Sequence, residues 1–235
     1  MRIHIRRIGV AGLLSVWLLA IAAVPASAQI EASFEAGYTE SEGINASQSR
    51  IVLGSVYNSL DITRGGSFGF TVGGFFTENW EAEFLFNRQF SSLEISDPAP
   101  TRKIANQNVD NYHGNLVYNF GTHESRLRPF LFGGLGATHY VPGDFDASLP
   151  VSSAQARING FSKFSSTWGG GIKAYFSPVV GVKASLRWTP TYIKSDADGL
   201  WCDPFYPTCW VIGNADYSNQ LAFSGGVTFR FGGPR

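Results

Sequence analysis

The chain has 235 residues with 18 basic and 18 acidic side chains, so its formal net charge at neutral pH is zero. Its 27 glycines and 19 phenylalanines are more typical of a β-rich protein than of a helical one. The balanced charge, without a basic stripe, argues against nucleic-acid binding. No stretch after residue 28 has the roughly 20 mostly apolar residues that a membrane-spanning helix needs.

Residues 1–28 have the three parts of a secretory signal peptide. Arginines open the segment, residues 8–24 form an uncharged apolar run, and residues 26–28 (Ala-Ser-Ala) supply the small side chains that a signal peptidase requires. We expect cleavage before Gln29 and a single domain over residues 29–235; the alternative is an uncleaved anchor. The signal holds three basic and no acidic residues, which leaves 15 basic against 18 acidic residues in the mature chain.

Alternation of apolar and polar side chains predicts eight strands after the signal, because side chains on a strand point to opposite faces in turn. The clearest is the last, where Leu221, Phe223 and Val227 share one face while Gln220 and Thr228 share the other. The predicted strands are residues 31–40, 67–76, 81–93, 109–120, 130–141, 161–176, 181–193 and 217–231.

Short and long connections alternate along the chain. The short ones lie near residues 77–80, 121–128 and 177–180, and the long ones near 41–66, 94–108, 142–160 and 194–216. This asymmetry is typical of outer-membrane barrels, whose short turns lie on the periplasmic side. Residues 49–60 could instead be strand, which would extend a strand above the membrane or raise the strand number to ten.

A soluble, lipocalin-like barrel would also have eight strands, but it would bury the aromatic face and expose the polar one. The polar face here carries few charges and many glycines, which would make a poor aqueous exterior. We therefore predict an all-β protein, an eight-stranded antiparallel up-and-down transmembrane β-barrel, with ten strands as the alternative.

The only two cysteines, Cys202 and Cys209, lie in one long connection. Export implies an oxidising compartment, so we expect a disulfide that closes a small loop. A metal pair is the alternative, but it would need two further ligands and none lies nearby at a familiar spacing.

Four passages make the chain resemble the outer membrane β-barrel superfamily, the group around the outer-membrane protein A-type membrane domain and the Opacity-type adhesins. They are residues 66–91, RPFLFGGLGATHY at 128–140, residues 168–188, and the terminal GGVTFRF at 225–231. The resemblance implies a place in the bacterial cell outer membrane of a Gram-negative organism. It also implies that Gly226, Phe229 and Phe231 form the signal read by the barrel-assembly machinery.

The polar faces of the strands would project ionisable side chains into the lumen. The candidates are Glu81, Glu83, His113, Lys173, Lys183, Arg187 and Arg230. Eight strands enclose a lumen just wide enough to be filled by side chains, and buried charges must be paired. We expect Glu83 to face Arg187, Lys173 or Arg230 in an ordinary polar core; the alternative is a gate whose ion pairs break to pass small ions.

Catalysis is the less favoured hypothesis. Among the histidines, His113 lies within a predicted strand, His123 in a short turn, and His139 near the end of a strand close to Asp144 and Asp146. Spacing cannot show the geometry that an activated nucleophile needs, and no Gly-x-Ser-x-Gly elbow is present. We expect no enzymatic activity, no cofactor and no metal.

The remaining expectations concern function. Trp201, Phe205, Tyr206 and Trp210 around the cysteines fit either a recognition surface or aromatic anchors at the lipid headgroups. We expect a structural or surface-interaction role, with a narrow, porin-like pore or transporter for small solutes or apolar compounds as the alternative. The expected partners are the lipid bilayer and lipopolysaccharide, with the barrel-assembly machinery and periplasmic chaperones during biogenesis, and the expected state is a monomer.

Overall fold

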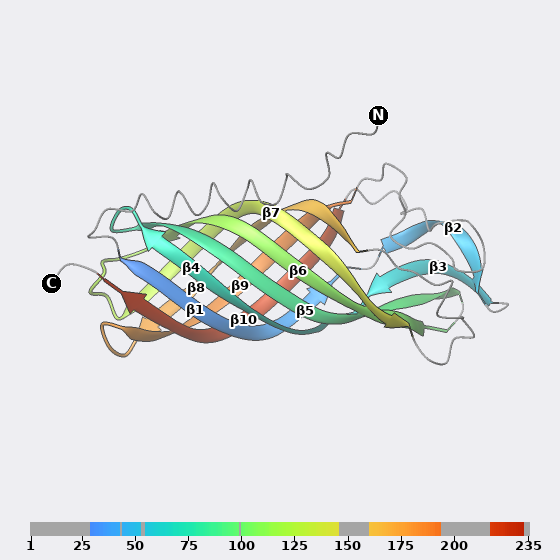
Figure 1. Ribbon diagram of the computed structural model, residues 1–235, viewed down its shortest axis with the longest axis horizontal. Coiled ribbons are helices and arrows are strands. Elements are labelled where there is room, and N and C mark those ends of the chain that lie inside the picture. The colour runs from blue at the N-terminus through green and yellow to red at the C-terminus, as the bar shows by residue number, and fades with distance from the viewer. Residues whose placement is uncertain are drawn as a thin grey trace, which may run out of the picture.

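The computed structural model describes residues 29–42, 44–52, 55–98, 100–145, 160–193 and 217–232, and these residues form ten β-strands (Figure 1). The strands are β1 (Ile30–Ser41), β2 (Ile44–Val52), β3 (Ser55–Ile62), β4 (Gly65–Phe75), β5 (Trp80–Pro98), β6 (Arg102–Asn119), β7 (Leu127–Phe145), β8 (Phe161–Tyr175), β9 (Val180–Tyr192) and β10 (Tyr217–Phe231). Within these ranges no helix is long and apolar enough to cross a membrane.

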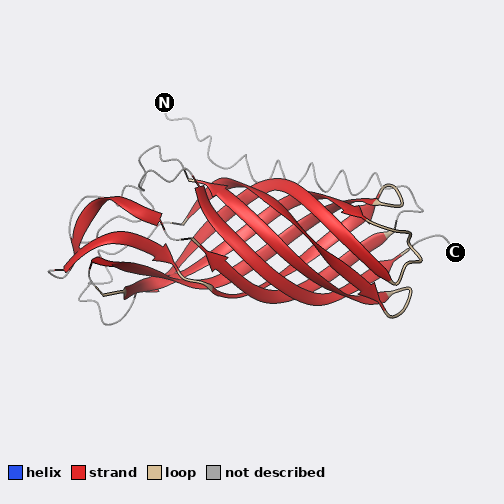
Figure 2. Cartoon of the chain, turned by 180° about the vertical axis from the view of Figure 1, so that it is seen from behind, coloured by secondary structure: helices blue, strands red, loops and turns tan. Residues whose placement is uncertain are grey.

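Eight of the strands close into a barrel (Figure 2). Neighbours around the wall are β1, β4, β5, β6, β7, β8, β9 and β10, each pair is antiparallel, and the β1–β10 and β5–β6 pairings complete the circle. The remaining two strands, β2 and β3, form a hairpin whose strand β3 pairs with β5 beyond the end of β4. The eight-stranded prediction is confirmed, and residues 49–60 lie in this hairpin, which extends the wall lengthwise.

Three short turns lie at one end of the barrel, here called the turn end. In the turns after β4 and β8, the hydroxyls of Thr77 and Ser177 accept hydrogen bonds from the backbone N–H groups of Trp80 and Val180, at 3.0 and 2.9 Å. The third turn, between β6 and β7, contains Gly121 at φ 82°, a left-handed conformation that glycine adopts without a steric cost. The predicted positions of the short connections are confirmed.

The opposite end, here called the hairpin end, corrects one expectation. Residues 94–108 were predicted as a long connection, but β5 and β6 continue to Pro98 and begin again at Arg102. Glu94 pairs with Lys103 on one side and with Asp61 on the other. Beyond the apolar belt neither face of the sheet is uniformly apolar, so the alternation that marks a strand disappears from the sequence.

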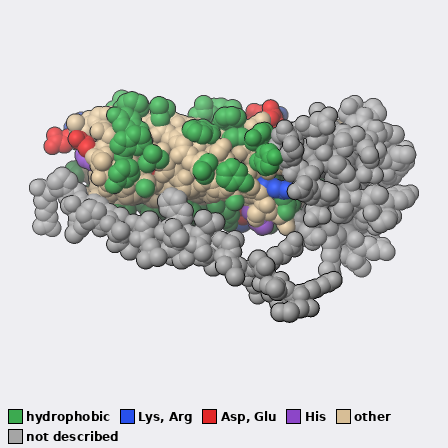
Figure 3. Space-filling view, turned by 90° about the horizontal axis from the view of Figure 1, so that it is seen from above, with side chains coloured by type: hydrophobic (Ala, Val, Ile, Leu, Met, Phe, Trp, Pro, Cys, Tyr) green, Lys and Arg blue, Asp and Glu red, His purple; other side chains and the backbone are tan. Residues whose placement is uncertain are grey.

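Apolar side chains cover the outside of the barrel. Trp168, Phe164 and Phe223 are 52%, 57% and 54% exposed, and the space-filling view in Figure 3 shows hydrophobic side chains spread over the wall. Charged side chains on the face drawn lie toward the two ends. Polar side chains fill the inside, since Lys173, Thr167 and Asn119 are fully buried. The barrel is therefore inside-out relative to a water-soluble one.

Aromatic rings also point inward from the glycine-rich strand β7. Phe130 and Phe132 are buried, and they lie against Gly171 and Gly169 of β8. A Cβ atom at Gly171 would lie 2.8 Å from Phe130 Cζ and would also clash with the carbonyl oxygen of Ala184. Glycine is needed here because the ring and the strand approach each other closely.

Replacing Gly171 with Ala should lower the free energy of unfolding by about 1–3 kcal/mol, because the added methyl group overpacks the ring of Phe130. The matched control is Gly225→Ala, since a Cβ at Gly225 would meet only the carbonyl oxygen of Lys183, at 3.8 Å. Urea unfolding in lipid vesicles measures both. Equal stability of the two variants would contradict the packing described.

Candidate functional site

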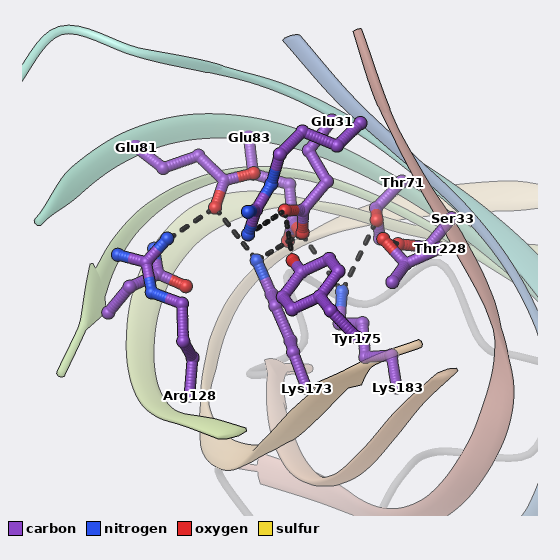
Figure 4. Close-up of polar contacts among 12 residues, drawn as sticks. Glu31, Ser33, Thr71, Glu81, Glu83, Arg128, Lys173, Tyr175, Lys183 and Thr228 are labelled. Carbon is purple, nitrogen blue, oxygen red and sulfur yellow. Dashed lines mark hydrogen bonds and ion pairs between the residues drawn. The ribbon is translucent and has the colours of Figure 1, made fainter. Parts of the chain in front are cut away.

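The inward faces of the strands bring charged side chains together in the half of the lumen nearest the turn end (Figure 4). The charge cluster, as we call it, consists of Glu31, Glu35, Glu81, Glu83, Arg128, Lys173, Lys183 and Arg230. Its members come from strands on opposite sides of the barrel, so they meet across the lumen and not along one ladder.

Lys173 on β8 is the centre of one half of the charge cluster. Its ammonium group is fully buried and forms ion pairs with Glu31 of β1 and with Glu81 of β5, the latter at 3.0 Å. Glu81 also accepts a hydrogen bond from Asn119 Nδ2 at 3.1 Å, and Glu31 accepts one from the hydroxyl of Tyr175 at 2.5 Å. Each buried carboxylate therefore has both a cation and a neutral donor, as buried charges require.

Lys183 on β9 plays the same part in the other half. Its Nζ lies 3.0 Å from Glu35 Oε1 and 3.1 Å from Glu83 Oε2, with Thr71 Oγ1 at 3.3 Å. Both lysines also lie over the ring of Phe130, with each Nζ 5.3 Å from its centroid. The inward aromatic ring thus packs between the ion pairs and adds a cation–π contact to each lysine.

Arginines and a histidine close the turn end of the lumen. Arg128 donates to the carbonyl oxygen of Glu78 at 3.0 Å, and Arg230 stacks over the ring of Tyr175 with its Cζ 3.7 Å from the centroid. His123, in the third turn, lies 3.3 Å from Arg128, and its carbonyl oxygen accepts a hydrogen bond from Arg230. Partial burial, together with these two guanidinium groups, holds the pKa of His123 below its ordinary value of 6.5.

A second group of polar side chains, the hydroxyl–amide cluster, lies farther from the turn end. It consists of Asn111, His113, Thr138, Ser165, Thr191 and Gln220. Thr138 Oγ1 lies 2.7 Å from Asn111 Oδ1 and 3.0 Å from the hydroxyl oxygens of Ser165 and Thr191. Hydrogen bonds connect these side chains across this layer of the lumen, and His113 Nδ1 is the atom of the cluster that has no partner among the described residues.

The predicted lumen residues separate into three sets. Glu81, Glu83, Lys173, Lys183 and Arg230 belong to the charge cluster, and His113 belongs to the hydroxyl–amide cluster with its Nε2 2.9 Å from Ser165 Oγ. Arg187 faces inward but joins neither cluster. The cation that pairs with Glu83 is Lys183, so the expected pairing with Arg187, Lys173 or Arg230 is wrong.

Sequence reasoning missed three members of the charge cluster, namely Glu31, Glu35 and Arg128. The two glutamates alternate with Ala32 and Phe34 on β1, so the period-two pattern could have placed them inside. Arg128 was assigned to a turn, but β7 begins at Leu127 and turns this side chain into the lumen, where it is fully buried.

Two of the described histidines, His113 and His139, each lie within hydrogen-bond distance of a serine hydroxyl. His139 points outward, and its Nδ1 lies 2.8 Å from the exposed Ser162 Oγ. The hydrogen bond between His113 and Ser165 is buried and includes no carboxylate. The side chain of Asp144, together with Asp146, lies outside the described residues, as do residues 1–28 and the pair Cys202 and Cys209.

The outer wall carries an open hollow of about 620 Å³. Small residues form its floor, because Ala36 and Ala184 stand opposite Gly225 in the ladders of β1, β10 and β9. Leu186 and Phe223 border it. The hollow is apolar and faces away from the lumen, so it is part of the outer surface and separate from the polar interior.

A closed antiparallel barrel with an apolar exterior, outward aromatic rings and an ionic interior is a transmembrane β-barrel. The family comparison agrees, because the model described as "Outer membrane protein beta-barrel domain" matches residues 14–231. The chain belongs to this family of bacterial outer-membrane barrels.

Solved structures support the fold. OprG from Pseudomonas aeruginosa matches with a TM-score of 0.58 at 12% sequence identity, over 88% of this chain and 97% of that chain. Neisserial surface protein A matches with a TM-score of 0.51 at 14% identity, over 88% of this chain and 98% of that chain. The search of curated proteins gave no match. At these identities the likeness establishes the architecture.

Replacing Lys173 with Met should lower the free energy of unfolding by about 3–5 kcal/mol, because Glu31 and Glu81 would lose a buried cation. The matched control is Arg64→Met, which removes an exposed partner 4.0 Å from Glu40 and should cost less than about 1 kcal/mol. Urea unfolding in lipid vesicles compares the two. A loss for the Lys173 variant no larger than that of the control would contradict the role of the ion pairs.

Proposed function

We propose that this barrel is a non-conducting, non-enzymatic protein of the bacterial outer membrane with a structural or surface-interaction role. The observation that carries the proposal is the charge cluster. Lys173, Arg128 and Glu81 are at most 1% exposed, and they join strands on opposite sides of the wall. An eight-stranded barrel leaves room for side chains only, and here charged and aromatic side chains occupy that room.

The hairpin end supports the surface-interaction part of the proposal. β2 and β3 add to the edge of β5 past the end of β4, so the wall is longer on this side than on the others. Short turns mark the periplasmic side of outer-membrane barrels and longer excursions mark the outside. The hairpin end then faces the medium, with lipopolysaccharide around its rim, where a rigid scaffold can present loops to a partner.

A narrow conduit for small solutes is the second candidate, and one observation favours it. Several buried polar atoms in the middle of the lumen have no hydrogen-bond partner, among them Asn87 Oδ1, Asn115 Oδ1 and Thr167 Oγ1. Buried polar groups of this kind are commonly satisfied by water. A hydrated middle section would become a path only if the charge cluster opened.

Planar-bilayer recordings in potassium chloride should show no steady channel events for the wild-type protein. The double variant Glu81→Ser with Lys173→Ser removes Lys173 together with one of its two glutamates, and Glu31 keeps Arg230 at 3.7 Å. This variant should introduce discrete openings. The control Lys163→Ala changes an inward cation opposite Thr138, outside the charge cluster, and should remain silent. Steady openings of the wild-type protein would contradict the closed lumen and favour the conduit.

Cysteine labelling of intact cells should reveal the direction of the barrel. In a background with Cys202→Ser and Cys209→Ser, a cysteine at Arg64, which follows the hairpin and is 69% exposed, should react with a membrane-impermeant maleimide. A cysteine at Glu124 in the third turn should react only after the outer membrane is permeabilised. The reverse pattern would place the hairpin in the periplasm and contradict a surface role.

A further inference from the structure

Arg187 of β9 is an inward cation in the spanning part of the barrel that forms neither a hydrogen bond nor an ion pair with any described residue. Its side chain is 5% exposed, and its Nε has no partner among the described residues. A buried guanidinium without compensation costs several kcal/mol, so a partner is expected on physical grounds.

The neighbouring strands offer Arg187 no carboxylate as a partner. Its direct neighbours across the ladders are Gly169 of β8 and Ala222 of β10, neither of which has a polar side chain. Thr167 lies diagonally across from Arg187, two residues from Gly169 on the same inward face, which is within reach of a long side chain. Thr167 is fully buried, and its hydroxyl oxygen also has no hydrogen-bond partner.

The charges nearby leave one positive charge over. Four inward carboxylates, Glu31, Glu35, Glu81 and Glu83, face five inward cations, Arg128, Lys173, Lys183, Arg187 and Arg230, between the turn end and the hydroxyl–amide cluster of the described chain. The two carboxylates that interact electrostatically with Arg187, Glu35 and Glu83, already form ion pairs with Lys183. Lys173, Lys183 and Arg230 form ion pairs with these glutamates, and Arg128 donates a hydrogen bond to the carbonyl oxygen of Glu78. Arg187 has no such contact among the described residues, so we assign the excess charge to it.

We propose that Arg187 and Thr167 bind a small inorganic anion of single charge and chloride size in the middle of the lumen. The guanidinium supplies the charge and N–H donors, and the Thr167 hydroxyl donates a further hydrogen bond. A single charge balances the excess. The ion has to be small because rings and side chains fill the lumen on both sides, with Phe132 against Gly169 and His113 against Ser165.

This site is independent of the proposed function, since a closed barrel can hold a buried anion as a structural ligand. Its consequence is a specific stabilisation by halide. A ligand that binds only the folded state raises stability by mass action, and at about ten times its Kd the melting temperature should rise by about 3–6 °C.

The first test is anomalous diffraction from crystals of the barrel grown in sodium bromide. We expect a bromide peak within hydrogen-bond distance of the Arg187 guanidinium and of Thr167 Oγ1. An ordered water at that position, without anomalous signal, would overturn the proposal. This experiment needs no variant, so it stays decisive even if substitutions at Arg187 prevent folding.

The second test compares thermal unfolding in sodium chloride and in sodium gluconate at equal ionic strength. The wild-type protein should be more stable in chloride, Arg187→Met should lose the difference, and Arg64→Met, an exposed arginine, should keep it. Thr167→Val should weaken the apparent chloride affinity about 5–10-fold, the loss of one hydrogen bond. Equal stability of the wild-type protein in both salts, a difference that persists in Arg187→Met, or an unchanged affinity in Thr167→Val would each overturn the proposal.

Discussion

The structure depends on keeping charge inside a wall whose outer surface is apolar. Within the membrane, the outward Phe and Trp side chains do not hold the strands together by the hydrophobic effect, because lipid tails are as apolar as these side chains. What is specific to this chain is that carboxylates and cations enter the lumen together. Lys173 and Lys183 each hold two glutamates from other strands, and these contacts tie opposite sides of the barrel to one another.

The same constraint explains why aromatic rings lie on both faces. Outward rings such as Trp168 and Trp188 contact the surroundings, and their indole N–H groups are satisfied by Ser166 and Asn219 of the wall. The inward ring of Phe130 fills space between the two lysines, where a second polar side chain would need a further partner. The glycines of β8 make room for this ring, so the packing of the interior around the two lysines requires glycine in that strand.

The sequence predicted the faces of the strands well and their partners poorly. Period-two alternation is a local property, so it placed Phe223 and Thr228 on opposite faces and Lys173 inside, and the structure agrees. Pairing across the lumen depends on the register and tilt of every strand between two residues, and Glu83 and Lys183 are 100 positions apart. The hairpin end was misread for a different physical reason, since strands that leave the apolar belt lose the alternation that identifies them.

The central claim is that the outward aromatic face is solvated by acyl chains. It is tested most directly by fluorescence of a variant that keeps Trp168 as its single tryptophan, reconstituted into vesicles whose lipids carry bromine along the acyl chains. The account predicts strong quenching by the brominated chains and little quenching by aqueous iodide. Quenching by iodide, with no effect of the brominated lipid, would contradict it.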